Sequence, residues 1–321
     1  MRAIVISATG GPEVLRHTDH PDPEPGAGRL LVRVAAAGVN FIDIYQRSGQ
    51  YSLPLPFVPG REGAGIVLAA GEGVTEFAPG DRVAWAGVLG SYAELLTVPV
   101  AQALPVPDGL DLTVAAAVPL QGMTAHYLTH SVHQVKPGDD VLVHAAAGGM
   151  GLLLTQMAKL RGANVIGTVS TDEKAKIARA AGADTVLRYE GFADAVRDLT
   201  GPGVHVVYDG VGAATFDDSL ASLRPRGMMA LYGAASGPVP PVDPMRLHNG
   251  GSLFLTRPTL NDYTATREEL LWRASDVFGW VASGELRIEV SERYPLAEAA
   301  SAHEALAARR TTGKLLLVPR P

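Results

Sequence analysis

Val141-Leu142-Val143-His144-Ala145-Ala146-Ala147-Gly148-Gly149-Met150-Gly151-Leu152 is the stretch that decides the fold. A short β-branched run leads into a turn of small residues, and a helical pattern follows at once. The spacing Ala146-x-Gly148-x-x-Gly151 is the dinucleotide fingerprint G-x-G-x-x-G with alanine in place of its first glycine. In that fingerprint the first small residue permits a tight turn, Gly148 lets the backbone approach a pyrophosphate, and Gly151 brings the helix close to the sheet. The helix N-terminus offers unpaired N–H groups to the phosphates. The alternative is a tight turn without a ligand, and the strand before it and the helix after it favour the dinucleotide site.

The composition limits the class of protein. The chain has 321 residues, enough for two domains, and 47% of them are hydrophobic, which predicts a sizeable core. Its net charge is −6, which argues against nucleic acid or an acidic membrane surface as a partner. There is no cysteine, which excludes disulfides and thiolate metal sites and fits a reducing compartment. No window reaches 18 apolar residues, so no membrane span is predicted, and a cytoplasmic location is expected.

The first part of the chain, to about residue 121, consists of short strands and turns and resembles a small β-barrel. Its predicted strands are Arg2–Ser7, Leu30–Ala36, Gly63–Ala69, Asp81–Ala86 and Ser91–Val98, with Thr113–Thr129 as an exit helix.

From about residue 130 strands and helices alternate, which predicts a doubly wound parallel sheet because parallel strands need crossover helices. Its six predicted strands are Val141–Ala145, Val165–Val169, Thr185–Tyr189, Val204–Tyr208, Met228–Tyr232 and Ser252–Thr256. Helices are predicted near Phe192–Leu199 and Thr215–Leu223, and later at Arg267–Ala282 and Ala297–Arg309. A last strand, Lys314–Val318, is expected to return to the first domain.

The end of the second predicted strand favours NADPH over NADH. NAD-binding sheets carry an acidic residue at this place for the ribose 2′-hydroxyl. Here the place holds Val169, followed by Ser170 and, four residues further on, Lys174. A hydroxyl and an ammonium suit a 2′-phosphate, and Tyr189 at the end of the third strand is a further candidate. The alternative is that Asp172 and its neighbouring glutamate point back at the ribose.

Several motifs together resemble one family. They are Gly11-Pro12-Glu13-Val14-Leu15, Gly38-Val39-Asn40-Phe41-Ile42-Asp43, Pro59-Gly60-Arg61-Glu62-Gly63-Ala64-Gly65, His144–Gly151 and Leu255-Thr256-Arg257-Pro258. The chain resembles the NADPH:quinone oxidoreductases, the zeta-crystallin-like, zinc-free branch of the medium-chain dehydrogenase/reductase superfamily. The resemblance implies an α/β fold with two domains: a GroES-like β-barrel catalytic domain formed by residues 1–121 and 263–321, and a Rossmann domain at residues 122–262 with a doubly wound parallel six-stranded sheet.

The resemblance also implies a set of cofactor contacts. Asn40 and Tyr45 would line the nicotinamide side, with Thr124 near the interdomain helix, and Gly149 and Met150 would bind the pyrophosphate alongside Gly148 and Gly151. Ser170, Lys174 and Tyr189 would surround the 2′-phosphate, and Gly233, Ala234, Ala235, Leu255, Thr256 and Arg257 would close over the nicotinamide end.

No metal site is predicted. The zinc-dependent alcohol dehydrogenases of the same superfamily have Cys where Asn40 stands, His where Arg61 stands and a four-cysteine loop, and this chain has none of these. His126 and His130 share the i, i+4 spacing but lack the glutamate of H-E-x-x-H and a third ligand. They are interpreted as ordinary surface or interface histidines.

The resemblance predicts an enzyme that reduces quinones by hydride transfer from NADPH without a metal. A quinone needs little activation, and Tyr45, Tyr51 and Arg257 are the candidate catalytic residues. The first alternative is a 2-enoyl or alkenal double-bond reductase, in which Tyr51 would supply the proton. The second is a crystallin-like NADPH-binding protein with a structural role. The acidic pI argues against RNA binding.

A homodimer is the predicted assembly. The strand Ser252–Thr256 is apolar and would lie at the sheet edge, where an uncovered edge invites pairing. In the family two such edges join. The alternative is an edge covered by the chain's own C-terminal helices.

Overall fold

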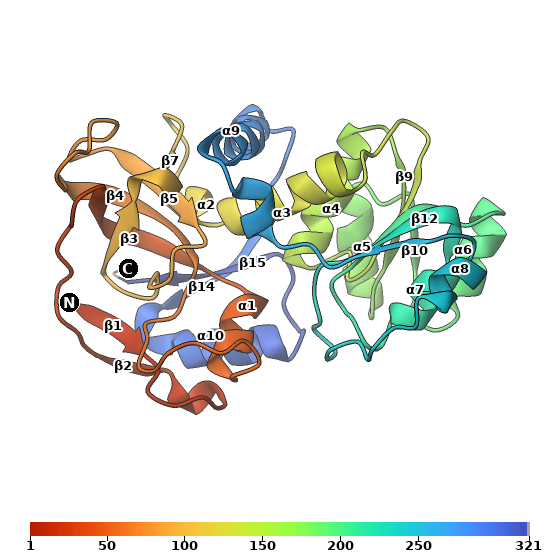
Figure 1. Cartoon of the computed structure of the whole chain (residues 1–321), viewed down its shortest axis with the longest axis horizontal. Helices are drawn as coiled ribbons and strands as arrows, with labels where there is room; N and C mark the ends of the chain where they lie inside the picture. The colour runs from red at the N-terminus through yellow and green to blue at the C-terminus, as the bar shows by residue number, and fades with distance from the viewer. Residues whose placement is uncertain (320–321) are drawn as a thin grey trace. The chain divides into compact units, whose positions relative to one another are not determined.

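The chain forms two compact units (Figure 1), described in a computed structural model for residues 1–319. Unit 1 comprises Met1–Met123 and the segment from Thr264 onward, and unit 2 comprises Thr124–Tyr263. The first unit is therefore discontinuous in sequence, with the second inserted into it.

Unit 2 is built on a six-stranded sheet in which every pair of neighbours runs parallel. Its order is β10-β9-β8-β11-β12-β13. The strands are β8 (Asp140–Val143), β9 (Asn164–Thr168), β10 (Thr185–Leu187), β11 (Val204–Asp209), β12 (Leu223–Leu231) and β13 (Phe254–Thr256). The prediction of a doubly wound parallel sheet with six strands is confirmed.

Helices connect these strands and pack on the sheet. They are α4 (Gly149–Leu160), α5 (Asp172–Ala180), α6 (Phe192–Thr200), α7 (Phe216–Ala221) and α8 (Met245–Asn249). Helices α4 and α5 pack against each other, as do α6 and α7. The strand order reverses at β8, because the chain runs outward through β9 and β10 and then returns to place β11 on the other side of β8. Sheets of this kind bind ligands beyond the carboxyl ends of the strands at such a reversal.

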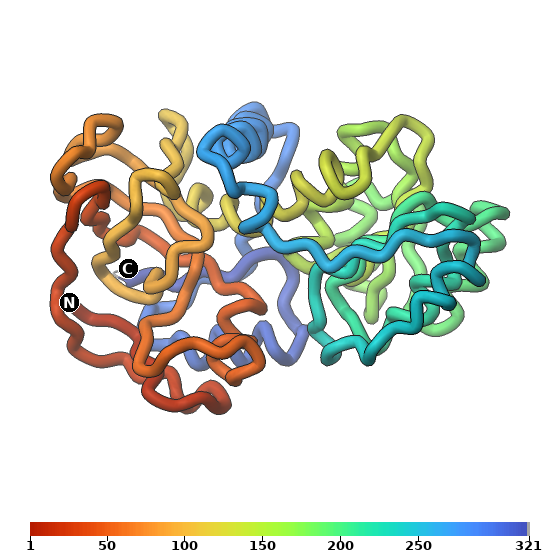
Figure 2. The backbone as a smooth tube through the Cα atoms, viewed as in Figure 1, coloured from red at the N-terminus to blue at the C-terminus, as the bar shows by residue number. Residues whose placement is uncertain are grey.

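Unit 1 contains a seven-strand sheet path in the order β14-β15-β3-β4-β5-β7 together with β6, which pairs with β3. The strands are β3 (Arg29–Val39), β4 (Glu62–Ala70), β5 (Arg82–Ala86), β6 (Leu95–Pro99), β7 (Leu104–Pro105), β14 (Val290–Pro295) and β15 (Lys314–Val318). The predicted return of the last strand is confirmed: β15 pairs antiparallel with β3. Figure 2 shows this blue C-terminal segment beside the red-to-orange N-terminal part of the unit.

The described part of unit 1 also contains a two-stranded sheet and five α-helices, the third of which continues into unit 2. The strands are β1 (Arg2–Val5) and β2 (Arg16–Asp19), and the helices are α1 (Phe41–Arg47), α2 (Leu112–Ala116), α3 (Pro119–Tyr127), α9 (Arg267–Ser283) and α10 (Ala299–Ala307). The core centres on the fully buried Trp85 and Tyr92, packed among aliphatic residues of β1, β3, β6 and β15.

The main errors of the sequence interpretation lie at element ends. The predicted exit helix Thr113–Thr129 is divided into α2 and α3, because Pro119 lacks an N–H group and disfavours helix in the residue before it. The predicted strand Val141–Ala145 ends at Val143, and the strand expected at Ser91 begins at Leu95. The helix expected to reach Leu223 ends at Ala221, since Leu223 already begins β12. The elements β2, α1, β14 and α8 were not predicted. Among the described residues, no helix is long and apolar enough to cross a membrane.

Candidate cofactor and acceptor site

The turn after β8 has the geometry of a phosphate-binding turn. Ala145 adopts a left-handed conformation with φ of 50°, unusual for a residue other than glycine. Gly148 is the N-cap of α4, so the helix begins within the fingerprint. A Cβ atom on Gly151 would lie 2.2 Å from the carbonyl oxygen of Ala145, so only glycine lets α4 approach the strand end this closely. Gly148 has more room: its Cβ would lie 3.3 Å from that oxygen.

Three hydrogen bonds hold this turn: two come from the ends of neighbouring strands and one lies within the turn itself. The N–H of Ala146 donates to the carbonyl oxygen of Thr168 at 3.0 Å, and the N–H of Gly148 donates to Ala145 at 2.8 Å. The N–H of Ala145 donates to the hydroxyl of Tyr189 at 3.1 Å. Tyr189, predicted to reach the 2′-phosphate, therefore also supports the turn itself.

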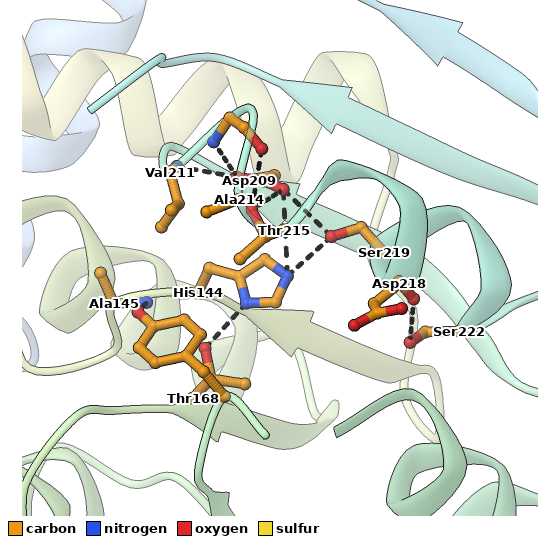
Figure 3. Close-up of polar contacts among 12 residues, drawn as sticks. His144, Ala145, Thr168, Asp209, Val211, Ala214, Thr215, Asp218, Ser219 and Ser222 are labelled. Atoms are coloured by element: carbon orange, nitrogen blue, oxygen red, sulfur yellow. Dashed lines mark hydrogen bonds and ion pairs between the residues drawn. The ribbon is translucent and has the colours of Figure 1, made fainter. Parts of the chain in front are cut away.

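A buried polar cluster lies at the carboxyl ends of β8, β9 and β11 (Figure 3). His144 Nδ1 lies 2.7 Å from Thr168 Oγ1, and its Nε2 lies 2.8 Å from Ser219 Oγ. Ser219 donates to Asp209 Oδ2 at 3.0 Å, and Thr215 donates to the same oxygen at 2.7 Å. All five residues are buried, and four of them are fully inaccessible.

Asp209 is surrounded by donors. Besides the two hydroxyls, its Oδ1 accepts the N–H groups of Val211 at 2.7 Å and Gly212 at 2.9 Å. Four hydrogen bonds satisfy the carboxylate, as a buried charge requires. The cluster therefore fixes the loop after β11 and the turn after β8 on either side of the strand-order reversal.

The predicted 2′-phosphate residues lie after β9 and in the first turn of α5. Ser170 is exposed at the end of β9, and the Thr171 hydroxyl caps α5 by accepting the N–H of Lys174 at 3.2 Å. Partial burial lowers the pKa of Lys174. Asp172, which was the alternative candidate for contacting the ribose, forms an exposed ion pair with Arg188 at 2.6 Å. That pair places a guanidinium next to the predicted phosphate-binding residues.

Most other predicted contacts of unit 2 follow the ends of β12 and β13. Gly233, Ala234 and Ala235 begin two residues after the end of β12, and Leu255 and Thr256 lie in β13, with the exposed Arg257 after it. Thr124 lies in α3. The carboxyl ends of parallel strands share one sheet edge, so the structure brings these residues to the edge that carries the turn.

In unit 1, Asn40 is held by a buried ion pair. Its Nδ2 donates to Glu62 Oε2 at 2.9 Å, and its Oδ1 accepts Lys314 Nζ at 2.7 Å and Gln121 Nε2 at 3.2 Å. Lys314 also contacts Glu62 Oε2, and both side chains are at most 2% exposed. A Cβ on Gly38 would lie 2.2 Å from that same carboxylate oxygen. The pair fixes the orientation of the Asn40 amide.

A second buried cluster in unit 1 joins α1 to α10. Asp43 Oδ2 accepts the Asn40 N–H at 2.9 Å and the Tyr92 hydroxyl at 3.0 Å. Tyr92 in turn lies 3.1 Å from His303 Nε2, and Arg47 Nη1 lies 3.2 Å from His303 Nδ1. Burial raises the pKa of Asp43 to about 7. Burial, with Arg47 nearby, lowers the pKa of His303 to about 3.

The two predicted acceptor tyrosines are brought together. The rings of Tyr45 and Tyr51 lie 5.3 Å apart in an edge-on arrangement, and the Tyr51 N–H donates to the Tyr45 carbonyl at 3.0 Å. Tyr45 is 9% exposed and Tyr51 39%. Such a pair presents an aromatic surface with a polar hydroxyl tip. Arg257, the third candidate, belongs to unit 2.

The interpretation of His126 as a surface or interface residue is wrong. It is fully buried, and its ring stacks on His130 at 4.2 Å. Its position on α3 between the buried residues Ala125 and Tyr127 explains the difference, since a histidine gives no periodic signal of its own. Among residues 1–319 there is no group of three or more His, Cys, Asp or Glu side chains that could hold a metal ion.

Sequence reasoning missed the residues that support the site rather than line it. Asp209, Ser219 and Lys314 were not singled out. A polar residue ending an apolar strand was the available signal for Asp209, and Lys314 begins the predicted last strand Lys314–Val318. Ser219 lies 75 positions from His144, and Lys314 lies 252 positions from Glu62 and 274 from Asn40, separations that no local pattern reveals.

Comparisons with known proteins cover the whole chain. Residues 26–108 match the alcohol dehydrogenase GroES-like domain, and residues 149–270 match the zinc-binding dehydrogenase family. A quinone oxidoreductase of Pseudomonas aeruginosa is 48% identical, with 99% of each chain covered. A 2-haloacrylate reductase of a Burkholderia species is 44% identical, also over 99% of each chain. A mycobacterial protein solved in complex with NADPH is 55% identical, with a TM-score of 0.97 and coverage of 99% and 100%.

Proposed function

Because the chain belongs to the quinone oxidoreductases of the medium-chain dehydrogenase/reductase superfamily and is an NADPH-dependent oxidoreductase, we propose that quinones are its acceptors. The observation that carries the proposal is the full-length similarity to quinone oxidoreductases, together with the Tyr45–Tyr51 pair. When bound, NADPH supplies a hydride, and one proton from solvent completes the hydroquinone. To reduce a quinone, the protein needs to provide little more than an aromatic surface and a hydrogen-bond donor to the quinone oxygen.

We propose that the turn after β8 holds the pyrophosphate of NADPH. The glycines of the turn leave room for it, and the N-terminus of the twelve-residue helix α4 presents Gly149 and Met150 N–H groups. Ser170, Lys174 and Tyr189 are proposed for the 2′-phosphate. Thr124, Gly233–Ala235 and Leu255–Arg257, with Asn40 and Tyr45 of unit 1, are proposed for the nicotinamide part.

A matched pair of lysines tests the 2′-phosphate assignment. Lys174→Gln removes the ammonium in the first turn of α5, whereas Lys176→Gln removes an exposed ammonium two residues along the same helix. The first variant should lose about 10-fold in NADPH affinity, the value of one charge-assisted contact, and leave NADH binding unchanged. The second should match the wild type. Equal behaviour of the two variants would remove Lys174 from the site.

One specific observation favours the alternative acceptor. The 2-haloacrylate reductase is nearly as similar as the quinone oxidoreductases, and Tyr51 has a partly exposed side chain. In double-bond reduction the hydride goes to one carbon and a proton must reach the next, which calls for a positioned acid. We infer that Tyr51 would take that role if the acceptor is an activated alkene.

The deciding experiment offers several acceptors in parallel. NADPH oxidation is followed optically with 1,4-benzoquinone, 9,10-phenanthrenequinone, 2-chloroacrylate and crotonyl-CoA, with NADH as the cofactor control. Rapid turnover of the quinones with NADPH is the expected result, and it should persist in Tyr51→Phe because the aromatic pair and the Tyr45 hydroxyl remain. Turnover of the alkenes alone, lost in Tyr51→Phe, would replace the proposal with the alternative. NADPH binding without turnover of any acceptor would favour the structural role.

We also propose a homodimer formed through β13. This strand is terminal in the sheet order, and its Phe254 is 56% exposed. An apolar strand edge is a template for a second copy of itself. Light scattering should give about twice the chain mass of 33.6 kDa, and Phe254→Lys should shift it toward the monomer. A wild-type mass of one chain would contradict the proposal. The cytoplasmic location stays a prediction that cell fractionation tests.

A further inference from the structure

His144 lies where the two halves of the unit 2 sheet meet. It follows β8 directly, and its side chain reaches Thr168 at the end of β9 and Ser219 of α7, which contacts Asp209 at the end of β11 (Figure 3). One side chain thus joins three neighbouring strand ends at the strand-order reversal. The ring is fully buried, so it does not itself face a ligand.

The four residues Asp209, Ser219, His144 and Thr168 form a hydrogen-bonded series. The position of each proton in it follows from which groups can donate and which can only accept. Asp209, as a carboxylate, accepts only, so the single proton of the Ser219 hydroxyl points to it. Ser219 must then accept from His144 Nε2, which therefore carries the ring proton. Nδ1 is left as an acceptor, and the Thr168 hydroxyl donates to it. These assignments make His144 a neutral imidazole in one tautomer.

Burial agrees with a neutral ring, since it lowers the pKa of His144 below the usual value for histidine. The negative charges that oppose this shift are Asp209, 4.0 Å from Nε2, and Asp218. Ser219 stands between the ring and Asp209 as the hydrogen-bonded bridge.

The same residues hold the phosphate turn. Thr168 donates its hydroxyl to His144 and accepts the Ala146 N–H at its carbonyl oxygen. The His144 ring stacks on Tyr189 at 6.1 Å, and the hydroxyl of Tyr189 accepts the N–H of the left-handed Ala145. The N–H groups of Ala145 and Ala146 in the turn are therefore both held by residues that contact His144, namely Tyr189 and Thr168.

We propose that His144 is a positioning residue for NADPH: as a neutral ring it ties the ends of β8, β9 and β11 together and holds the Ala145–Gly151 turn in its binding geometry. It acts through Thr168 and the turn and does not touch the cofactor. The inference rests on NADPH binding and not on the identity of the acceptor.

Four variants separate the bonds from the packing. Thr168→Val keeps the shape of the side chain and removes the donor to Nδ1. His144→Phe keeps a ring against Tyr189 and removes both bonds. His144→Asn retains an acceptor near the Nδ1 position, and His144→Gln retains a donor near the Nε2 position. Thr155→Val on α4 is the matched control, because the Thr155 hydroxyl is buried and has no hydrogen-bond partner among the described residues.

The readout is the dissociation constant of NADPH and of NADH, measured by fluorescence on the full chain. Because the affected element is the pyrophosphate turn, both constants should rise by the same factor, whereas Lys174→Gln should affect NADPH alone. We expect about 10-fold or more for His144→Phe and about 5-fold for Thr168→Val, the effects of two bonds and one. The Asn and Gln variants should fall between His144→Phe and the wild type.

Steady-state kinetics adds a second readout. With the acceptor that turns over best, KM for NADPH should rise in Thr168→Val while kcat stays within twofold of the wild type. Dissociation constants within twofold of the wild type for Thr168→Val, or an equal loss in Thr155→Val, would overturn the proposal, and this holds even if His144→Phe fails to fold. A chain that binds NADPH but reduces no quinone would contradict the proposed function and leave this test intact.

Discussion

Each unit buries a neutral histidine that is linked to an aspartate through one hydroxyl group, Ser219 in unit 2 and Tyr92 in unit 1, but the two aspartates have different partners. In unit 2, Asp209 accepts four hydrogen bonds, two from hydroxyls and two from backbone N–H groups. In unit 1, Asp43 accepts two bonds at Oδ2, and its buried Oδ1 has no partner among the described residues.

The group that donates to Nδ1 of each histidine differs as well. His144 accepts from the neutral hydroxyl of Thr168, whereas His303 accepts from the guanidinium of Arg47. Burial is the main reason why the pKa of His303 falls to about 3, and the charged donor Arg47 lowers it further because it opposes protonation of the ring. The unit 1 cluster combines a carboxyl group whose pKa is raised with a histidine ring whose pKa is lowered. We infer that it shapes the pH dependence of folding, while the unit 2 cluster shapes the cofactor turn.

The largest effect is expected at the Lys314–Glu62 ion pair, which unit 1 buries away from solvent. Lys314→Met leaves the Glu62 charge without its ammonium, so the free energy of unfolding should fall by about 3–5 kcal/mol. All three tryptophans, Trp85, Trp272 and Trp280, belong to unit 1, so tryptophan fluorescence during urea unfolding reports this unit. Adding Glu62→Gln should restore part of the loss, and a single variant within about 1 kcal/mol of the wild type would contradict the role of the pair.

The next effect concerns the unit 2 turn alone. In Gly151→Ala the new Cβ meets backbone atoms of Ala145 and Ala146, so either the turn or α4 must shift. NADPH affinity should fall by about 100-fold, while the tryptophan-monitored unfolding of unit 1 stays unchanged. Gly279→Ala on α9 has open space around its Cβ and serves as the control. Wild-type affinity in Gly151→Ala would show that the turn tolerates displacement.

The third effect is the pH dependence of the stability of unit 1, to which Asp43 and His303 contribute with opposite signs. The raised pKa of Asp43 makes unit 1 lose stability as pH rises from about 4 to about 7, because the unfolded carboxyl releases its proton first. The lowered pKa of His303 makes stability fall as pH drops from 6.5 to about 3, because the unfolded ring binds a proton first. The two slopes oppose each other in the wild type.

Single substitutions should expose each slope. In Asp43→Asn, stability should increase with pH between about 4 and 6.5, by at most about 1.4 kcal/mol per pH unit. In His303→Gln it should decrease with pH over the same window by a similar amount. Urea unfolding followed by tryptophan fluorescence across this window gives both slopes. Slopes of the same sign in the two variants would disprove the assignment.

The smallest effect compares two helix caps of the same kind. Thr171 accepts the Lys174 N–H at the start of α5, and Thr266 accepts the Glu269 N–H at the start of α9. Each substitution by Ala should remove about 1 kcal/mol. Thr266→Ala should appear in tryptophan-monitored unfolding, whereas Thr171→Ala should appear only in NADPH affinity and in the circular dichroism melt. A signal of Thr171→Ala in the tryptophan transition would show that the units unfold together.

Local pattern predicted most of the fold. The parallel sheet follows from the alternation of predicted strands and helices that begins near residue 130. The division of the exit helix at Pro119 was also visible in principle. The strand β14 was missed because its pattern is mostly polar, and it exists through pairing with β15.

The sequence predicted the residues that line the site but not the buried residues that hold them in place. The fingerprint glycines and the residues after each strand could be located because parallel strands end at one edge. The connections of His144 to Ser219 and of Lys314 to Glu62 join positions 75 and 252 residues apart, and only the folded chain brings them together. The left-handed Ala145 was likewise invisible, since alanine carries no signal for that conformation.

The most direct test of the contrast between the units uses the same substitution in both. His144→Phe and His303→Phe each replace a fully buried histidine by a ring of similar size in the full-length chain. The measurement is the dissociation constant of NADPH at neutral pH. We expect a rise of about 10-fold or more for His144→Phe and a change of less than about twofold for His303→Phe. Equal constants in the two folded variants would contradict this expectation.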